Sequence, residues 1–340
     1  MLKNAINKVI QFQNLTQKEA FNAMEIIMSG QTSEAQITAF LVALRMKNET
    51  VEEITGFAEC MRKFATPVQV DLAKNPIDIV GTGGDGKHTF NISTVSALVI
   101  AGAGVPVAKH GNRSVSSKCG SADVLAELGV KTDLSAEQMG HSIKETGIGF
   151  LFAPMLHPAM KYAIGPRREL GARTVFNILG PITNPAGVKR QIIGVYDASL
   201  MQPLIEVLQA LKSEHILIVH SDDGLDEISI AGPTYIVELK NDEISSYSIT
   251  PEELGLTRDS GSITGADAVE NARMAKDVLS GAPGPTRDIV LANSGAGVYV
   301  SGQVESIADG VKKVAQSIDS GAALNKLEQL IGVSQNLGSS

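Results

Sequence analysis

Two short segments of the sequence combine glycine with cations and small polar side chains, and each directly follows a short apolar run. The first covers residues 81–86 and reads GTGGDG, and the second covers residues 109–117 and reads KHGNRSVSS. Glycine-rich turns expose backbone N–H groups, and a helix that follows adds its positive dipole end, so both segments suit anions. Ligands of open α/β sheets bind outside the carboxyl ends of strands. The two segments together therefore predict a ligand with phosphate at both ends.

The glycine-rich segment approaches two known phosphate-binding patterns and completes neither. Gly81, Gly83 and Gly86 have the spacing of the dinucleotide fingerprint, which also needs an acidic residue about 20 positions further on. Residues 90–121 contain no Asp or Glu. The segment also reads G-x-x-x-x-G-K up to Lys87, but His88 stands where a P-loop has its Mg²⁺-binding hydroxyl. Taken alone, a glycine cluster of this kind is more often a tight strand-to-helix turn with Ser/Thr caps, so the second segment is needed for the argument.

The composition is that of a globular chain with a sizeable core. The 340 residues are 43% hydrophobic and 19% charged, which lies in the ordinary range. A net charge of −8 without a run of five basic residues argues against a nucleic-acid partner. The longest apolar stretch, residues 95–108, is interrupted by Gly and Pro and is too short to span a bilayer. We therefore expect neither a nucleic-acid nor a membrane partner.

The expected compartment is the cytoplasm. The first residues, MLKNAINKVIQFQ, lack the long apolar run and the cleavage site of a signal peptide. The sequence has two cysteines, Cys60 and Cys119. Nothing else in the sequence indicates an extracellular setting, so both are expected to be reduced thiols.

Local patterns predict a small helical unit followed by an α/β domain. In residues 1–70, helix starts are marked by the capping boxes Thr16/Glu19, Ser33/Gln36 and Thr50/Glu53. From residue 75 onward the pattern alternates between strands and helices, which predicts a central, mostly parallel sheet. The strands are expected at residues 77–80, 105–108, 191–196, 215–220, 235–239 and 244–249, and helices at 91–104, 121–128 and from 135.

At the second segment the chain resembles the anthranilate phosphoribosyltransferases, within the wider class that includes pyrimidine nucleoside phosphorylases. The matching stretches are GTGGD (81–85), NIST (91–94), KHGNRSVSSKCGSADVLAELG (109–129), HPAMK (157–161), RTVFNILGPITNP (173–185) and GLDE (224–227). The resemblance runs over essentially the whole chain. It implies a helical domain of residues 1–70, with part of 163–190 packed near it, hinged to an α/β domain of residues 75–340, and a homodimer through the helical part.

The resemblance implies transfer of the phosphoribosyl group of phosphoribosyl diphosphate to the amino group of anthranilate, with release of pyrophosphate, in tryptophan biosynthesis. The departing pyrophosphate accumulates negative charge and the ribose passes through an oxocarbenium-like state, so positioning and electrostatics are expected to supply most of the acceleration. No side chain is expected to act as nucleophile or general base. The implied cofactor is Mg²⁺. Asp226 and Glu227 are consecutive and point apart in extended backbone, so two ions fit better than one.

The resemblance also assigns residues to the two substrates and the metal. The donor, phosphoribosyl diphosphate, is assigned Gly81, Gly84, Asp85, Thr89, Asn91, Ile92, Ser93, Thr94, Lys109, His110, Gly111, Asn112, Arg113, Ser114, Val115, Ser116, Ser117 and Ser121. The acceptor, anthranilate, is assigned Gly81, Asn112, His157, Arg167, Gly180 and Pro181. The metal is assigned Ser93, Asp226 and Glu227.

Three features near the acceptor residues have more than one interpretation. Arg167 suits the anthranilate carboxylate because a guanidinium can meet it bidentately, but Arg168 beside it is an alternative. Gly165-Pro166 departs from the family pattern and is expected to break the chain direction near the hinge. His110 and His157 are expected to shape the site rather than to transfer protons.

Two alternative functions compete with this interpretation. A nucleoside phosphorylase-like transferase would keep the donor site and use another acceptor, whereas this chain keeps His157, Arg167 and Gly180-Pro181. A catalytically silent homologue that binds nucleic acid would show a basic groove and would lack the metal carboxylates, whereas this chain is acidic and keeps Asp226 and Glu227.

Overall fold

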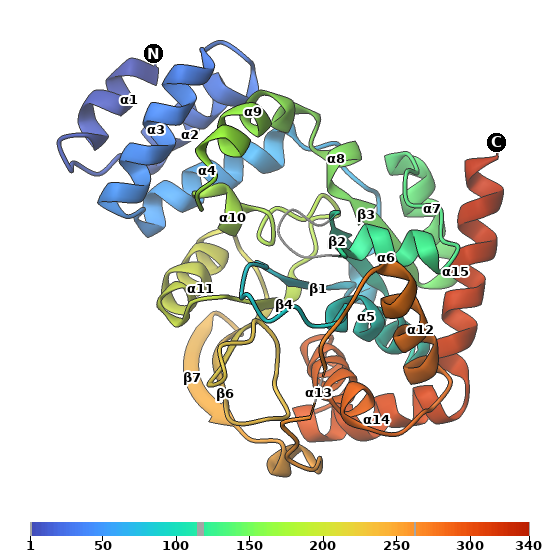
Figure 1. Ribbon diagram of the computed structural model, residues 1–340. Helices are drawn as coiled ribbons and strands as arrows, with labels where there is room; N and C mark the ends of the chain where they lie inside the picture. Colours follow the sequence, from blue (N-terminus) through green and yellow to red (C-terminus); the bar gives the residue numbers. More distant parts are fainter. Residues whose placement is uncertain (1, 114–118, 262, 340) are drawn as a thin grey trace.

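The computed structural model describes residues 2–113, 119–261 and 263–339. It consists of an N-terminal helical bundle at one end of the molecule and a larger α/β part built around one sheet (Figure 1). This architecture confirms the predicted fold class. No helix within the described ranges has the length and apolar character needed to cross a membrane.

Four helices form the N-terminal bundle, α1 (Leu2–Val9), α2 (Gln17–Met28), α3 (Glu34–Lys47) and α4 (Val51–Phe64). Complete capping boxes start α2 and α4, as predicted. At the start of α3, Ser33 accepts from the backbone of Gln36, but the Gln36 side chain accepts a hydrogen bond from Thr32 instead of closing the box. The Thr32 hydroxyl therefore takes the place of the Ser33 backbone N–H as the donor to Gln36 Oε1.

Three further helices follow the third strand, α8 (Ala153–Leu156), α9 (Lys161–Leu170) and α10 (Phe176–Leu179). α9 packs against α2 and α3, and α10 packs against α4, so this part of the chain lies on the helical bundle (Figure 1). The expected break at Gly165-Pro166 is wrong, because α9 continues through both residues. Gly165 instead allows close packing, since a Cβ there would lie 2.8 Å from the Glu34 carboxylate of α3.

The sheet has seven strands in the order β3-β2-β1-β4-β5-β6-β7. Strands β1 to β5 are parallel, and β6 and β7 extend the sheet as antiparallel neighbours of β5. The order reverses between β1 and β4, which makes their carboxyl ends the topological switch point. The strands are β1 (Ile77–Gly81), β2 (Val107–Gly111), β3 (Ile148–Phe152), β4 (Arg190–Gly194), β5 (His215–Ser221), β6 (Thr234–Lys240) and β7 (Glu243–Ile249).

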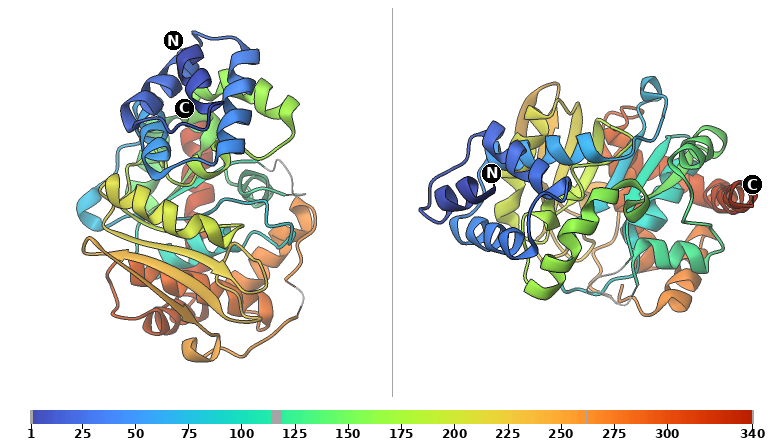
Figure 2. Two further views of the ribbon diagram at one scale, coloured as in Figure 1. Left: turned by 90° about the vertical axis from the view of Figure 1, so that its left-hand side faces the viewer. Right: turned by 90° about the horizontal axis from the view of Figure 1, so that it is seen from above.

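The sheet is covered by helices on both faces. One face is packed by α5 and α13, and the other is packed by α11 (Figure 2). The remaining helices surround the first of these layers. The helices of the α/β part are α5 (Ile92–Gly102), α6 (Ser121–Glu127), α7 (Ala136–Thr146), α11 (Met201–Ala210), α12 (Ala268–Leu279), α13 (Pro285–Val300), α14 (Ile307–Asp319) and α15 (Ala322–Gly338).

The two faces of the sheet belong to two separate apolar cores. Side chains alternate along a strand, so Ile192 of β4 joins the core beneath α5 and α13, and the next residue, Ile193, joins the other core. The second core is continuous from α11 into the helical bundle, where it includes Phe40 and Phe57. The bundle is therefore attached to the sheet by shared apolar packing as well as by the connecting segment.

Candidate active site

Asp226 lies at the switch point, against the ends of the two central strands. Its Oδ2 accepts a hydrogen bond from the Gly83 backbone N–H at 2.8 Å. A Cβ at Gly81 would come within 2.5 Å of that carboxylate, and a Cβ at Gly194 would come within 1.6 Å of the Asp226 carbonyl oxygen. Glycine at the last position of both β1 and β4 is thus what allows a carboxylate to sit between the strand ends.

Glu227, the next residue, reaches the N-terminus of α5. Its carboxylate is hydrogen bonded to the backbone of Ser93 in the first turn of that helix. The Ser93 hydroxyl in turn accepts from Lys109 Nζ at 3.3 Å, and Lys109 Nζ also donates to the Ile79 carbonyl at 2.7 Å. The structure therefore brings the three predicted metal ligands to one place, with a buried ammonium group next to them.

The electrostatics of this place indicate a cation site. Burial and, to a smaller extent, the charge of Asp85 together raise the pKa of Asp226 to about 7. Burial also raises the pKa of Glu227 well above its ordinary value, with a smaller contribution from Asp226. Carboxylates that are buried together repel one another unless a cation lies between them.

The predicted metal-ligand set fits Mg²⁺ in particular. Asp226, Glu227 and the Ser93 hydroxyl supply the oxygen ligands that this hard cation prefers. The described part of the chain contains no cluster of three or more His, Cys, Asp or Glu side chains that could hold a metal. Because Mg²⁺ usually keeps several waters and shares substrate phosphates, two carboxylates and a hydroxyl are a sufficient protein contribution.

The glycine-rich segment needs residues that tolerate positive φ. Gly83, Gly84 and Gly86 have φ values of 65°, 79° and 74°, and His88 follows with 52°. Asp85 accepts from the Lys87 backbone at 3.0 Å through Oδ1, and its buried Oδ2 has no partner among the described residues. The second carboxylate oxygen is therefore available to a ligand or a metal-bound water.

Arg173, to which the sequence analysis assigned no role of its own, contacts the glycine-rich segment. Arg173 donates a short hydrogen bond to the Gly84 carbonyl. Its guanidinium group also lies over the Tyr196 ring, 3.8 Å from the centroid. Arg173 comes from the chain between α9 and α10, so it connects the helical side of the molecule to the donor segment.

Residues 89–94, which lead into α5, include five of the predicted donor residues, and Ser93 is described above. Thr89 pairs with the backbone of a distant segment near residue 264, and Ile92 is buried in the core. The buried Thr94 hydroxyl has no hydrogen-bond partner among the described residues. The Asn91 side chain donates to the Cys119 carbonyl at 3.2 Å, which connects this helix to the loop after β2.

The loop after β2 is described in part. Asn112 and Arg113 are exposed, and the Arg113 guanidinium lies 5.8 Å from the centroid of the Phe152 ring. A Cβ on Gly111 would lie only 2.4 Å from the Ser121 hydroxyl oxygen. The Ser121 hydroxyl donates to the Asn112 carbonyl at 3.0 Å. The predicted donor residues Ser114, Val115, Ser116 and Ser117 lie outside the described residues.

Predicted acceptor residues meet around two buried histidines. The rings of His110 and His157 lie 5.2 Å apart. The His110 ring is hydrogen bonded to the Gly180 carbonyl, and the Pro181 carbonyl accepts from Gln191 Nε2 at 3.0 Å. In both histidines the buried Nε2 has no partner among the described residues, which leaves these nitrogen atoms for a ligand.

Both histidines are neutral at physiological pH. Burial and, to a smaller extent, the neighbouring ring of His157 together lower the pKa of His110 to about 3. Burial lowers the pKa of His157 to about 4. Because the carbonyl of Gly180 can only accept, a hydrogen bond from His110 Nδ1 to it would leave a lone pair on Nε2.

Arg167 and Arg168 differ in their surroundings. Arg168 is exposed, whereas Arg167 is half-buried in the last turn of α9 and lies 5.1 Å from the centroid of the Phe176 ring. Burial lowers the pKa of Arg167. Among the described residues, no carboxylate forms an ion pair with it. A half-buried cation without a partner favours a negatively charged ligand at this position.

A buried polar network beneath both sets of residues was missed by the sequence analysis. Asp78 accepts from the His110 backbone at 3.0 Å and from Asn184 Nδ2 at 2.8 Å. Burial raises its pKa to about 6, and the charge of Lys109 opposes that rise. A carboxylate in the middle of an apolar strand, between Ile77 and Ile79, was the signal that could have revealed it.

A buried asparagine on α13 holds the chain next to the carboxylate pair. Asn293 Oδ1 accepts from the Ile228 backbone N–H at 2.9 Å, and its Nδ2 donates to the Ile228 carbonyl at 2.9 Å. The side chain thus pairs with the backbone in the way a neighbouring strand would. No motif marks this residue in the sequence, because its partner is 65 residues away.

Two family models together match nearly the whole chain. The glycosyl transferase family helical bundle domain matches residues 3–65, and the glycosyl transferase family a/b domain matches residues 73–324. An anthranilate phosphoribosyltransferase of Geobacter sulfurreducens is 51% identical, with 97% of this chain and 99% of the relative covered. One of Moorella thermoacetica is 50% identical, with 97% and 98% covered.

Solved structures agree with these relatives. The anthranilate phosphoribosyltransferase of Thermus thermophilus superposes with a TM-score of 0.92 at 41% identity, covering 97% of this chain and 99% of that one. The enzyme of Saccharomyces cerevisiae in complex with PRPP and Mg has a TM-score of 0.90 at 28% identity, covering 98% of each chain. On the matched fold and these relatives, the chain belongs to the anthranilate phosphoribosyltransferase family.

Proposed function

We propose that this chain transfers the phosphoribosyl group of phosphoribosyl diphosphate to the amino group of anthranilate and releases pyrophosphate, a step of tryptophan biosynthesis. The observation that carries the proposal is the pairing of two unlike half-sites. The donor half consists of segment 81–86, the start of α5, Lys109 and the pair Asp226–Glu227. The acceptor half consists of His110, His157, Gly180-Pro181 and Arg167. A multiply charged donor suits the first, and an aromatic amine with one carboxylate suits the second.

In the donor half, we assign the diphosphate to the glycine-rich segment and the N-terminus of α5. Positive-φ glycines and a helix N-terminus present backbone N–H groups to phosphate oxygens. Asp226, Glu227 and Ser93 would hold Mg²⁺, and we infer two ions because the consecutive carboxylates contact different elements. When bound, the metal neutralises the charge that develops on the departing pyrophosphate.

In the acceptor half, Arg167 would bind the carboxylate of anthranilate and so fix the ring. The neutral histidines would line the path of the amine, and the free Nε2 lone pair of His110 can accept a hydrogen bond from it. Such a contact aims the nitrogen lone pair at the ribose carbon without requiring a general base. An aromatic amine is a nucleophile without prior deprotonation, so positioning is the main contribution of this half.

The yeast relative supports both assignments, since its structures are described as complexes with PRPP and Mg and with 4-fluoroanthranilate. The direct test is a fluorescence assay that follows the consumption of anthranilate. We expect consumption only when phosphoribosyl diphosphate and Mg²⁺ are both present. Consumption of a nucleoside with phosphate, and not of anthranilate, would instead favour the nucleoside phosphorylase-like alternative. We infer a cytoplasmic reaction, because the charged donor does not cross a bilayer unaided.

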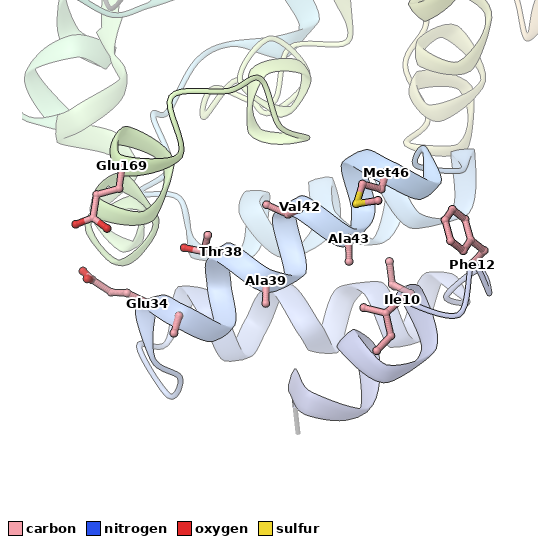
Figure 3. Close-up of a pocket in the computed structure, with 11 residues that line it drawn as sticks. Ile10, Phe12, Glu34, Thr38, Ala39, Val42, Ala43, Met46 and Glu169 are labelled. Atoms are coloured by element: carbon pink, nitrogen blue, oxygen red, sulfur yellow. The ribbon is translucent and has the colours of Figure 1, made fainter.

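We infer that the working form is a homodimer built on the helical bundle. A groove of about 740 Å³ lies on the outer side of α1 and α3, and α9 contributes Glu169 at one end (Figure 3). Three large apolar side chains at this groove are more than half exposed, namely Ile10, Phe12 and Met46. Apolar groups gathered in this way favour a protein partner, and a self-complementary face suits a second copy of the chain.

Light scattering after size exclusion tests this inference. The expected mass is twice the 35.8 kDa of the chain, and Met46→Asp is expected to return it to one chain. Leu72→Asp is the matched control, because Leu72 is an exposed apolar residue that does not line the groove. A wild-type mass of one chain at micromolar concentration would contradict the dimer and leave the reaction unaffected.

A further inference from the structure

A segment late in the chain, residues 263–271, pairs with the exit of the glycine-rich segment. Thr89 and Thr264 form an isolated antiparallel bridge. Two backbone hydrogen bonds between residues 88–90 and 263–265 flank the bridge, with N···O distances of 3.1 and 2.8 Å. Some 170 residues of sequence separate the two partners, so no local pattern links them.

Gly265 lets the two backbones come this close. A Cβ on Gly265 would lie 2.7 Å from the Thr89 carbonyl oxygen and 2.7 Å from the Phe90 nitrogen. Real Cβ atoms do not approach backbone atoms to such distances, so any side chain would push the segments apart. The contact is therefore built for close backbone approach, which is one of the uses of glycine.

Asn271, at the end of this segment and in the first turn of α12, is buried with both ends of its amide bonded. Its Oδ1 accepts from the Ala266 backbone N–H at 2.7 Å, and its Nδ2 donates to Asn91 Oδ1 at 3.0 Å. Only 2% of the residue is exposed. The bond from Ala266 fixes the orientation of the Asn271 amide, so that its Nδ2 points toward Asn91 in the donor half.

Asn91 stands at the N-cap position of α5 but makes no side-chain capping bond. Its Oδ1 accepts from Asn271 Nδ2 at 3.0 Å and, as a weaker bond, from Cys119 Sγ at 3.5 Å, and its Nδ2 donates to the Cys119 carbonyl at 3.2 Å. The side chain thus connects α5, the loop after β2 and segment 263–271. Asparagine is among the preferred N-cap residues, so a free Asn91 amide would tend to turn onto the first N–H groups of α5.

We propose that Asn271 is a positioning residue of the donor half. It turns the Asn91 amide away from the N-terminus of α5 and toward the loop after β2. This keeps the helix N-terminus open for an anion and fixes the start of α5 relative to Cys119. The inference rests on the proposed function, because it takes phosphoribosyl diphosphate as the anion.

The test uses two variants of nearly the same size as asparagine. Asn271→Leu removes both hydrogen bonds without adding charge, whereas Asn271→Asp keeps the acceptor for Ala266 and places a carboxylate oxygen, which cannot donate, against Asn91 Oδ1. In both variants we expect the KM for phosphoribosyl diphosphate to rise about tenfold, the effect of one lost hydrogen bond of about 1.4 kcal/mol. The KM for anthranilate should change by less than about twofold, because no hydrogen bond among the described residues joins this segment to an acceptor residue. Calorimetric affinity for pyrophosphate with Mg²⁺ should fall in parallel.

Val278→Ala is the matched control, because Val278 is a buried residue of the same helix without a hydrogen bond to the donor half. It should lower the unfolding temperature and leave the donor KM unchanged. In the double variant Asn91→Ala/Asn271→Leu, the second change should add little to the first. If Asn271→Leu does not fold, Asn271→Ser is used, since its shorter side chain does not reach Asn91.

Three results would overturn the inference: an unchanged donor KM in both Asn271 variants, an equal rise in Val278→Ala, or additive effects in the double variant. The wild-type chain is assayed first with anthranilate, phosphoribosyl diphosphate and Mg²⁺. A wild-type chain without activity would contradict the proposed function itself. An active wild type with an unchanged donor KM in the variants would contradict only the role of Asn271.

Discussion

The donor half and the acceptor half are built by opposite means. In the donor half, buried charges are gathered: Asp226 and Glu227 lie together, with the Lys109 ammonium nearby, and backbone and side-chain hydrogen bonds hold each of them. In the acceptor half, burial removes charge, because His110 and His157 are neutral. The only charge described there is the half-buried Arg167, which has no carboxylate partner among the described residues.

This difference matches the chemistry of the two substrates. A diphosphate leaving group needs a site that is already organised for negative charge and a metal, because reorganising charge during the reaction would raise the barrier. An aromatic amine needs a dry, neutral wall and one anchoring cation, because a protonated neighbour would compete for its lone pair. Substitutions in the two halves should therefore affect different substrates.

The largest effect is expected in the donor half, from Glu227→Gln. The change removes a metal ligand and leaves the size of the side chain almost unchanged, so turnover should fall by about a hundredfold or more while the fold is kept. Steady-state kinetics and circular dichroism measure the two outcomes. Asp222→Asn is the control, because Asp222 is an exposed carboxylate of the same loop region. Full activity of Glu227→Gln would contradict the metal assignment.

The next effect concerns the anchor of the acceptor half. Arg167→Ala removes a charge-assisted pair with the anthranilate carboxylate, which is worth about 2–3 kcal/mol. We expect the KM for anthranilate to rise by roughly 30- to 150-fold, with the donor KM nearly unchanged. The exposed neighbour provides the matched comparison, and Arg168→Ala should change neither KM by more than about twofold. If Arg168→Ala raises the KM for anthranilate more than Arg167→Ala does, Arg168 and not Arg167 binds the carboxylate.

A pH effect should distinguish the carboxylate pair from the rest of the donor half. Burial and nearby carboxylates raise the pKa of Asp226 from its ordinary 3.8 to about 7. A raised pKa means that the folded chain binds the proton more tightly than the unfolded chain. In the absence of metal, this group therefore loses its favourable contribution as the pH rises from about 4 to about 7.

Mg²⁺ binds the ionised form, so it should raise the unfolding temperature more at pH 8 than at pH 5.5. Scanning calorimetry with and without Mg²⁺ at both pH values measures the difference. In Asp226→Asn, the difference between the two pH values should shrink, because the side chain can no longer ionise. An equal Mg²⁺ effect at both pH values in the wild-type chain would place the metal elsewhere.

The smallest effect is expected from His157→Phe, which keeps an aromatic ring in the acceptor half. Removing a general acid or base usually costs about a hundredfold or more. Because burial lowers the pKa of His157 to about 4, we expect less than a tenfold loss and an unchanged pH profile between about pH 6 and pH 8. A pH–rate profile of wild type and variant decides between the two roles.

The sequence predicted what depends on local pattern and on complete motifs. The capping boxes of α2 and α4 and the glycine-rich turn after β1 are short-range features, and the structure contains them. Glycine also allows close contacts between distant parts of the chain, which the sequence alone does not reveal. Gly81 is required by the carboxylate of Asp226 and Gly194 by its backbone, although Asp226 is more than 30 residues away from either of them in the chain.

What the sequence did not predict depends on contacts between distant residues. Strand β3 and helices α12 to α15 carry no site motif and were not placed in advance. Asn271 and Asn293 lie on two of those helices, and each bonds to a partner at least 65 residues away. Gly165-Pro166 was expected to interrupt the chain because it departs from the family pattern, but α9 continues through both residues and packs on α2 and α3.

Titration calorimetry of phosphoribosyl diphosphate with Mg²⁺ is the most direct test that the two halves are separate sites for separate substrates. The titration is carried out on the wild-type chain, on Arg167→Ala and on Glu227→Gln, each without anthranilate. We predict that Arg167→Ala binds the donor with wild-type affinity and that Glu227→Gln loses at least about tenfold. Loss of donor binding in Arg167→Ala, with binding retained in Glu227→Gln, would contradict the account.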